Sequence, residues 1–231
     1  MTKEKIEETL DQAQGCIRYG RLAMADSLLE PLAKNVETLE VEDEVKFAIL
    51  YIYFENAWKL KGDVTVFPFA EKAAEYAEAK VKSVIYQRLA SYAIQKLELD
   101  KATEYMSLCE KYAEDENLQI DIYRTNGVLL FRKGHREEAI EALYKALTMA
   151  EAVNQRVQCC YINMYLADVY KELWRPELAF NYLATAEQLA YECRDIHLLY
   201  MCTIREAKML YESGRDEEAR KMIESTPLHM D

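Results

Sequence analysis

The sequence contains few of the residues that interrupt regular structure. Only 6 glycines and 4 prolines occur in 231 residues. The alternation of apolar and polar residues that is typical of strands is almost absent, and VTVF at 64–67 is the one short candidate. Because Ala, Leu, Glu and Lys, which favour helices, fill much of the remainder, the sequence predicts an all-α protein.

Long apolar runs are also missing. None approaches the roughly 20 residues that a helix needs to cross a bilayer. The N-terminal stretch MTKEKIEETLDQ lacks the apolar centre of a signal peptide. The 6 cysteines are scattered without a CxxC pair, which indicates buried small side chains in a reducing compartment. We therefore expect a cytoplasmic protein that does not insert into membranes.

Motifs for catalysis or metal binding do not occur in the sequence. It has no Gly-rich phosphate loop and no GxSxG, HExxH or EF-hand spacing. The histidines, His135, His197 and His229, hold different places in the repeat described below, so they are not expected to converge on a metal. Paired glutamates at 137–138 and 217–218 fit the acidic first turn of a helix better than acid–base catalysis. We expect no enzyme, no cofactor and no bound metal.

Basic residues are fewer than acidic ones. The 29 basic and 41 acidic residues give a net charge of −12. A field of this sign repels phosphate backbones, so nucleic acid is not expected as the main ligand. A protein or peptide is the expected partner, and a homo-oligomer formed through the terminal repeats is also compatible with the pattern.

What the sequence does contain is a repeat. The stretches GHREEAIEAL (134–143), WRPELAFNYL (174–183) and GRDEEARKMI (214–223) follow one another at a step of 40 residues. Each stretch centres on an alanine that has a small residue twelve positions before it. These small pairs are Gly127/Ala139, Ala167/Ala179 and Ala207/Ala219, and the same spacing gives Ala90/Ala102 and Ala13/Ala25. Small residues facing each other let two helix axes approach to the lower end of the ~8–10 Å range, so the spacing predicts helix hairpins.

Turn residues fall between the two halves of each hairpin. Glycines expected to end the first helix are Gly20, Gly62, Gly134 and Gly214. Where glycine is missing, Pro176 is predicted to begin a helix and Asp100 to cap one. The stretch VTVFPF at 64–69 is interpreted as a widened turn, with Pro68 near the start of the next helix. Pro31 is predicted to kink or shorten its helix.

Two stretches carry a family resemblance. Residues 122–150 have Tyr123, Gly127, Leu130, Gly134, Ala139, Leu143 and Ala146, and residues 160–190 have Leu166, Ala167, Tyr170, Ala179, Leu183 and Ala186. This spacing resembles the tetratricopeptide repeat, and the likeness covers nearly the whole chain. The step of 40 residues exceeds the usual repeat of roughly 34 residues. The proline that closes many repeats of this family is also missing. The long step and the missing proline both indicate the long-helix branches of the family, which include peptide-sensing and motor-adaptor proteins.

The resemblance implies a right-handed α-solenoid of about six helix-turn-helix repeats, forming one domain over residues 1–231. The repeats are expected near 6–39, 44–80, 83–116, 120–153, 160–193 and 200–231. It also implies a concave groove lined by the first helix of each pair. The residue after the small one, and those at i±4 from it, should face this groove.

The expected peptide-binding residues follow from that rule. They are Asn56, Lys59, Gln87, Ser91, Gln95, Arg124, Val128, Arg132, Met164, Asp168, Lys171, Lys208 and Tyr211, with Ile52, Phe131 and Ile204 on the same faces. The set is more basic and richer in amides than the chain as a whole, which suits an extended peptide whose backbone binds amides and whose carboxylates bind arginine. Arg124 and Arg132 are expected either to bind an acidic or C-terminal peptide or to pair with Asp168.

The sequence therefore predicts a non-catalytic scaffold that holds an extended peptide or partner segment in its groove. Two other interpretations stay open. In the first, the chain is a sensor module of a bacterial peptide-responsive system and regulates a phosphatase or a transcription factor. In the second, the polar faces of its helices are merely in contact with solvent. The pattern does not match the Lys/Asn clamp with which some co-chaperones of this family hold a terminal carboxylate.

Overall fold

The chain is helical throughout the part that the structure, a computed structural model, describes, which is residues 2–113 and 116–225. Twelve α-helices and two short 3-10 helices occur there, and these residues include no strand. None of the helices in the described ranges is long and apolar enough to cross a membrane. The predicted all-α repeat fold is confirmed.

Two compact units divide the chain, unit 1 at residues 1–115 and unit 2 at residues 116–231. Unit 1 contains α1 (Lys3–Arg18), α2 (Leu22–Lys34), η1 (Val36–Thr38), α3 (Asp43–Lys61), η2 (Val64–Val66), α4 (Phe67–Glu75), α5 (Ala79–Gln95) and α6 (Leu99–Tyr112). Unit 2 contains α7 (Glu116–Arg132), α8 (Arg136–Ala152), α9 (Arg156–Glu172), α10 (Pro176–Cys193), α11 (Ile196–Glu212) and α12 (Asp216–Ser225).

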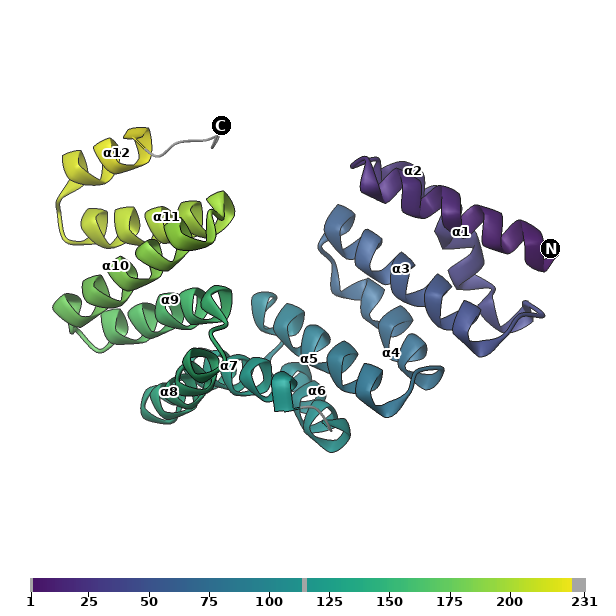
Figure 1. The fold of residues 1–231 in the computed structure, drawn as a ribbon, viewed down its shortest axis with the longest axis horizontal. Coiled ribbons are helices and arrows are strands. Elements are labelled where there is room, and N and C mark those ends of the chain that lie inside the picture. Colours follow the sequence, from purple (N-terminus) through teal and green to yellow (C-terminus); the bar gives the residue numbers. More distant parts are fainter. Residues whose placement is uncertain (1, 114–115, 226–231) are drawn as a thin grey trace. The chain divides into compact units, whose positions relative to one another are not determined.

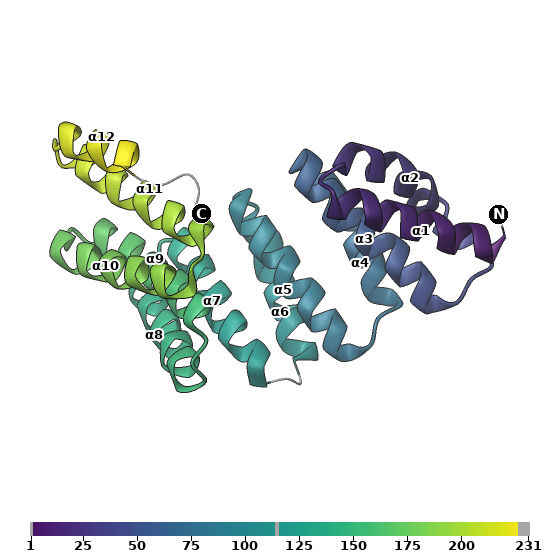
Figure 2. The same ribbon diagram turned by 45° about the horizontal axis from the view of Figure 1, so that its top comes forward.

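Within each unit the helices form consecutive antiparallel pairs (Figures 1 and 2). The pairs are α1/α2, α3/α4 and α5/α6 in unit 1, and α7/α8, α9/α10 and α11/α12 in unit 2. Each pair begins one to four residues before the start predicted for its repeat. We call α1, α3, α5, α7, α9 and α11 the first helices. That the whole chain acts as one domain stays a prediction.

The predicted small pairs lie where the two helices of a pair cross. All ten of their residues are buried. A Cβ atom at Gly127 would lie 2.7 Å from Cγ of Leu143 and 3.2 Å from the carbonyl oxygen of Ala139, so α7 and α8 approach too closely there for a larger residue. In the second pair, for which the spacing of twelve residues gave no small pair, the fully buried small residues are Ala57 and Ala70.

The turn inside every pair contains a residue in the left-handed backbone conformation. Glycine takes this place at positions 20, 62, 134 and 214, as predicted. Leu97 and Trp174 take it in the other two turns, with φ of 60° and 56°. The prediction that Asp100 caps a helix is wrong, because α6 already begins at Leu99 and Asp100 lies within its first turn. The left-handed Leu97 turns the chain two residues before α6, which a rule based on glycine does not detect.

The prolines act largely as predicted. Pro176 is the first residue of α10, and Pro68 lies in the first turn of α4. The VTVF stretch is no strand, because residues 64–66 form the 3-10 helix η2 in a widened turn. Pro31 lies inside α2, which has 13 residues against 17 in α8 and 18 in α10.

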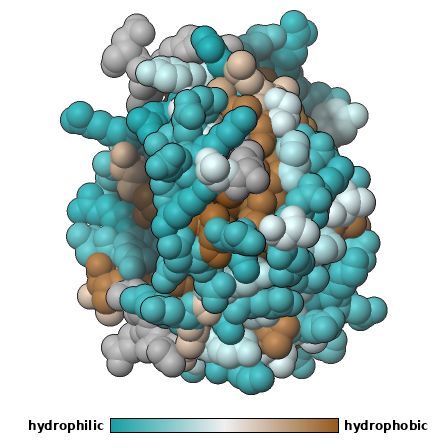
Figure 3. Space-filling model, turned by 90° about the vertical axis from the view of Figure 1, so that its right-hand side faces the viewer, coloured by the Kyte–Doolittle hydropathy of each residue, from teal (hydrophilic) through white to brown (hydrophobic). Residues whose placement is uncertain are grey.

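Apolar side chains gather into cores between the helices of each unit. In unit 2, one core lies between α7, α8 and α9 and a second between α9, α10 and α11. On the face of the molecule in Figure 3, hydrophobic side chains form a strip that hydrophilic side chains border. This is the pattern of amphipathic helices that bury one side and expose the other.

Candidate functional site

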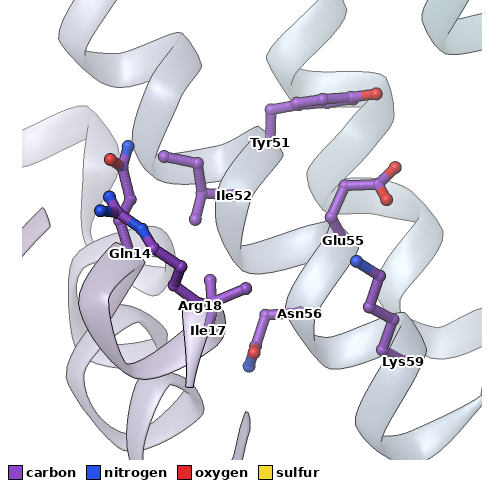
Figure 4. A pocket seen from close by; sticks show the side chains of 8 residues that line it. All are labelled: Gln14, Ile17, Arg18, Tyr51, Ile52, Glu55, Asn56 and Lys59. Atoms are coloured by element: carbon purple, nitrogen blue, oxygen red, sulfur yellow. The ribbon is translucent and has the colours of Figure 1, made fainter. Parts of the chain in front are cut away.

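A pocket of about 400 Å³ lies between the first helices α1 and α3 of unit 1 (Figure 4). Its lining residues are Gln14, Ile17 and Arg18 from α1 and Tyr51, Ile52, Glu55, Asn56 and Lys59 from α3. The structure thus brings together all three face positions that the sequence predicted on α3, namely Ile52, Asn56 and Lys59. The pocket is the candidate site.

Helical spacing explains why these side chains meet. Ile52, Asn56 and Lys59 follow one another at intervals of four and three residues, so they share one face of α3. Gln14, Ile17 and Arg18 are related in the same way on α1. The two faces lie against each other because α1 and α3 are neighbours in unit 1.

Asn56 is the most buried lining residue that carries a polar group. Its side chain is 1% exposed. The Nδ2 atom donates a hydrogen bond to the Leu22 carbonyl oxygen on α2 at 3.0 Å, which fixes the orientation of the amide. The Oδ1 atom is buried and has no hydrogen-bond partner within the described residues. An unpaired buried acceptor is costly, and a ligand that supplied a donor would remove that cost.

The charged groups of the pocket differ in whether they have a partner, and its phenol is neutral. Glu55 forms an ion pair with Arg88 of α5, with 2.9 Å between Oε1 and Nη1. Burial raises the pKa of Tyr51 to about 12, and the Glu55 carboxylate adds to this shift, so the phenol is neutral at physiological pH. Arg18 and Lys59 form no ion pair with any described residue. The pocket therefore offers two cations without carboxylate partners and two buried oxygens that accept no hydrogen bond from the described residues, Oδ1 of Asn56 and Oε1 of Glu55.

The predicted positions on α5 lie outside the lining of this pocket. Nε2 of Gln87 donates a hydrogen bond to Oγ of Ser91 at 3.2 Å, and both side chains are half-buried. Gln95 is exposed at the end of the helix. Whether these residues contact a ligand stays a prediction.

The predicted positions on α7 separate into buried and accessible ones. Val128 and Phe131 are both 7% exposed, so the expectation that they present apolar surface to a ligand is corrected: they belong to the interior. Arg124 binds Asp121 of its own helix, with 2.7 Å between Nη2 and Oδ1, and does not pair with Asp168. Arg132 is exposed at the end of α7.

Gln158 of α9 also binds Asp121, the partner of Arg124. Its Nε2 atom donates to Oδ1 of Asp121 at 3.0 Å. The Arg124 guanidinium also lies over the ring of Tyr161, 5.9 Å from its centre. Asp121, Gln158 and Tyr161 were absent from the sequence prediction, although Asp121 lies three residues before the predicted Arg124 and Tyr161 three before the predicted Met164. Arg124 is thus held by its own unit.

On α9, Met164 is fully buried in the core between α9, α10 and α11, which corrects its predicted place on a ligand-binding face. The reason is that α9 contacts α7, α8, α10 and α11, so neighbouring helices cover more of its surface than the rule for groove-facing residues assumes. Asp168 pairs with Arg205 of α11, a residue that the sequence rule did not select. Lys171 binds Glu212 at 3.1 Å.

The predicted residues of α11 are accessible. Tyr211 is 66% exposed and Ile204 44%. Nζ of Lys208 lies 3.9 Å from Glu212, an exposed pair of little energetic weight. These side chains lie on a first helix of unit 2, outside the lining of the pocket between α1 and α3.

Side chains that could hold a metal do not gather in the described ranges. No cluster of three or more His, Cys, Asp or Glu residues is placed to bind a metal there. Nδ1 of His135 lies 2.8 Å from Glu138 on the surface of α8. His197 lies in the first turn of α11, and His229 lies outside the described residues.

Comparison with known proteins identifies the fold. No protein-family profile and no curated protein matches the chain. Among solved structures, a Rap protein complexed with competence and sporulation factor is similar at a TM-score of 0.64 and 14% identity, over 97% of this chain and 65% of that one. The chain thus spans about two thirds of the Rap protein's length.

Two further structures show the same arrangement. A signal transduction ATPase with a tetratricopeptide repeat sensor, from Pyrococcus horikoshii, is similar at a TM-score of 0.60 and 19% identity, over 96% of this chain and 34% of that one. PlcR of Bacillus thuringiensis, in complex with the peptide PapR7 and DNA, is similar at 0.61 and 13%, over 83% of this chain and 71% of that one. The chain therefore has a tetratricopeptide-like repeat fold.

Proposed function

We propose that the protein is a non-catalytic scaffold that holds an extended peptide, or an extended segment of a partner protein, against its first helices. The observation that carries the proposal is the pocket between α1 and α3. It is lined by first helices alone, and it contains a buried acceptor and two cations without partners. Such polar groups in a partly apolar recess suit a peptide, which brings both backbone donors and side-chain charge.

The predicted side chains that are exposed on the first helices of unit 2 are also cations or tyrosine, as in the pocket of unit 1. Arg132, Lys208 and Tyr211 are exposed on α7 and α11. Arginine and tyrosine are over-represented at the centres of protein interfaces. These residues supply a second region of the first helices where a ligand is proposed to bind.

A second candidate is a sensor module of a bacterial peptide-responsive system that regulates a phosphatase or a transcription factor. Among the similar structures, the Rap protein was solved with competence and sporulation factor, and PlcR was solved with the peptide PapR7. Their likeness to this chain at 14% and 13% identity supports the fold, and the shared fold makes a regulatory peptide a partner to test.

The test begins with partners recovered by pull-down from the source cell and identified by mass spectrometry. Each recovered partner is then titrated by calorimetry against the wild type, Lys59→Ala and Arg132→Ala. Arg220→Ala is the matched control, because Arg220 is an exposed arginine on the second helix α12. A partner that binds the wild type and the control, but binds either first-helix variant several-fold more weakly, supports the scaffold function.

Equal affinity for all four proteins would remove the first helices as the binding surface. The identity of the partner separates the two candidates. A phosphatase, a transcription factor or a short secreted peptide among the specific partners favours the sensor module, and a structural or motor protein favours the scaffold. Turnover of any member of a substrate panel would contradict both.

A further inference from the structure

The exposed side of α10 carries no charge over about three helical turns. This helix is the second of the fifth pair and lies between the second helices α8 and α12 in unit 2 (Figure 1). Its exposed residues between positions 178 and 188 are Leu178, Asn181, Ala184, Thr185 and Gln188. On α8, by contrast, most exposed residues are charged, namely Glu137, Glu138, Glu141, Lys145 and Glu151. Because 30% of the whole chain is charged, this surface is a local departure in composition.

Ordered aromatic side chains border the uncharged surface. The ring of Tyr182 on α10 lies parallel to that of Tyr170 on α9, with 5.3 Å between their centres. The Tyr144 hydroxyl of α8 is hydrogen-bonded to both of theirs, at 3.1 Å from that of Tyr170. Trp174, in the turn that precedes α10, is 90% exposed. Tyrosine and tryptophan are enriched at the centres of protein interfaces, and rings that already hold one another lose little freedom when a partner covers them.

The charge of the chain limits which partner can cover this surface. Two copies that each carry −12 repel one another wherever acidic surfaces meet. In a two-fold symmetric contact each residue near the axis meets its own copy, so a charged residue there would face a like charge. The uncharged side of α10 avoids that cost, and a second copy of the chain can therefore approach it.

The polar groups of the surface can also pair with themselves. The Asn181 side-chain amide both donates and accepts, and it has no hydrogen-bond partner among the described residues. Two such amides facing each other across an axis form two hydrogen bonds. The Thr185 hydroxyl donates to the Asn181 carbonyl oxygen at 3.0 Å, and its own oxygen can still accept. The surface thus presents no polar group that its own copy would leave unsatisfied.

The exposed side chains set the strength of such a contact. A fully covered aromatic side chain buries about 150–250 Å², and Trp174 is available for nearly all of its share. Tyr144 and Leu178, which are 38% and 40% exposed, add smaller areas. These few side chains fall below the roughly 800 Å² per partner of a standard interface. The surface therefore fits a weak dimer that forms at high concentration.

We propose that α10 and its aromatic border pair with the same surface of a second copy of the chain in a two-fold symmetric dimer. The residues that form this surface are Tyr144, Trp174, Leu178, Asn181, Tyr182 and Thr185. The contact uses the fifth pair and not the terminal repeats. It also lies outside the first helices, so it is independent of the proposed peptide binding.

Sedimentation velocity of the purified full-length protein, run from about 1 μM to about 1 mM, measures the association. We expect a monomer at the low end of this range and a growing dimer fraction at the high end. Asn181→Asp and Asn181→Lys should each weaken the dimer at least about tenfold, because like charges then meet across the axis. An equimolar mixture of the two variants should associate again, since the introduced carboxylate of one copy faces the introduced ammonium of the other.

Leu178→Glu should weaken the dimer in the same way. Its matched control is Leu60→Glu, because Leu60 of α3 is 41% exposed against 40% for Leu178, and both changes add one negative charge. Circular dichroism shows that each variant is folded, and the nearly isosteric Asn181→Asp keeps the test valid if Leu178→Glu is not.

Four results would overturn the proposal. They are a monomer at every concentration, a dimer that Asn181→Asp leaves unchanged, an equal loss of association in Leu60→Glu and Leu178→Glu, and a mixture of the two Asn181 variants that stays monomeric. None of these results bears on binding at the first helices, so the proposed scaffold function is tested separately.

Discussion

Asp168 of α9 accepts a hydrogen bond from Arg205 of α11, with 3.2 Å between Oδ2 and Nε. The bond joins the first helices of two consecutive pairs in unit 2. Burial raises the pKa of the Asp168 carboxyl above its usual range, and the charge of Arg205 opposes that shift. The ion pair therefore does not fully offset the cost of removing the carboxylate from water.

The raised pKa predicts how stability depends on pH. The folded protein binds a proton at Asp168 more readily than the unfolded chain, whose pKa is about 3.9. Stability from this group is therefore present below the unfolded pKa and is lost as the pH rises through the folded pKa. As the pH rises from the unfolded pKa through the folded pKa, the free energy of unfolding of the wild type should fall relative to that of Asp168→Asn. Urea denaturation of both proteins as a function of pH checks this, and a wild type that gains on the variant as the pH rises would contradict it.

Trp174 is expected to be a better site for glycine than for tryptophan. Its φ of 56° is costly for a residue with a Cβ atom, and its side chain is 90% exposed, so little packing is lost on removal. Trp174→Gly should raise the free energy of unfolding by about 1 kcal/mol relative to Trp174→Ala, which keeps the Cβ atom. Denaturant titrations of the two variants give the difference directly. A glycine variant no more stable than the alanine variant would show that this turn is not strained.

Overpacking at the helix crossings should destabilise the protein. Ala139 and Ala179 are fully buried where α8 meets α7 and α10 meets α9. Ala139→Leu or Ala179→Leu should lower the free energy of unfolding by roughly 1–3 kcal/mol, since the added atoms must displace the facing helix. Thermal melts measure the effect. Glu141→Leu is the control, because Glu141 is an exposed residue of α8 where leucine meets only water. Equal melting temperatures for Glu141→Leu and Ala139→Leu would show that α8 does not pack closely against α7 at Ala139.

The two arginines of α7 should respond differently to alanine. The Arg124 side chain is 16% exposed and binds Asp121, so Arg124→Ala should destabilise the fold by about 1–3 kcal/mol. Arg132 is exposed and has no ion pair with a described residue, so Arg132→Ala should leave the melting temperature unchanged. Melts of both variants test this contrast. It also makes Arg132 the cleaner probe of ligand binding, since a loss of affinity there cannot be attributed to a loss of folding.

Much of the fold was predictable because it depends on short-range patterns. The spacing of small residues found the five close helix crossings, and glycine found four of the six turns. At the other two turns, Asp100 and Pro176 indicated the following helix, but the left-handed residues Leu97 and Trp174 were not predicted, since nothing in an isolated leucine or tryptophan indicates that conformation. Tertiary packing imposes that conformation where the repeat needs it.

The candidate site was predictable only in part. The face rule put Ile52, Asn56 and Lys59 on one face of α3, and all three line the pocket, because a helix face follows from spacing alone; that they bind a ligand stays a prediction. It gave no positions for α1, so Arg18 was missed. It also could not show that the ion-pair partner of Asp168 is Arg205, because such a choice depends on how two helices are rotated against each other.

The two tryptophans give each half of the chain its own optical probe. Trp58 of unit 1 stacks on Tyr92, with 4.3 Å between ring centres, whereas the indole of Trp174 in unit 2 is already in contact with water. Unfolding changes the surroundings of Trp58 far more, so the shift in intrinsic fluorescence reports chiefly on unit 1. Far-ultraviolet circular dichroism reports on the helices of both. Coincident transitions by the two methods are what a single cooperative domain requires, and separated transitions would show that the halves unfold as independent bodies.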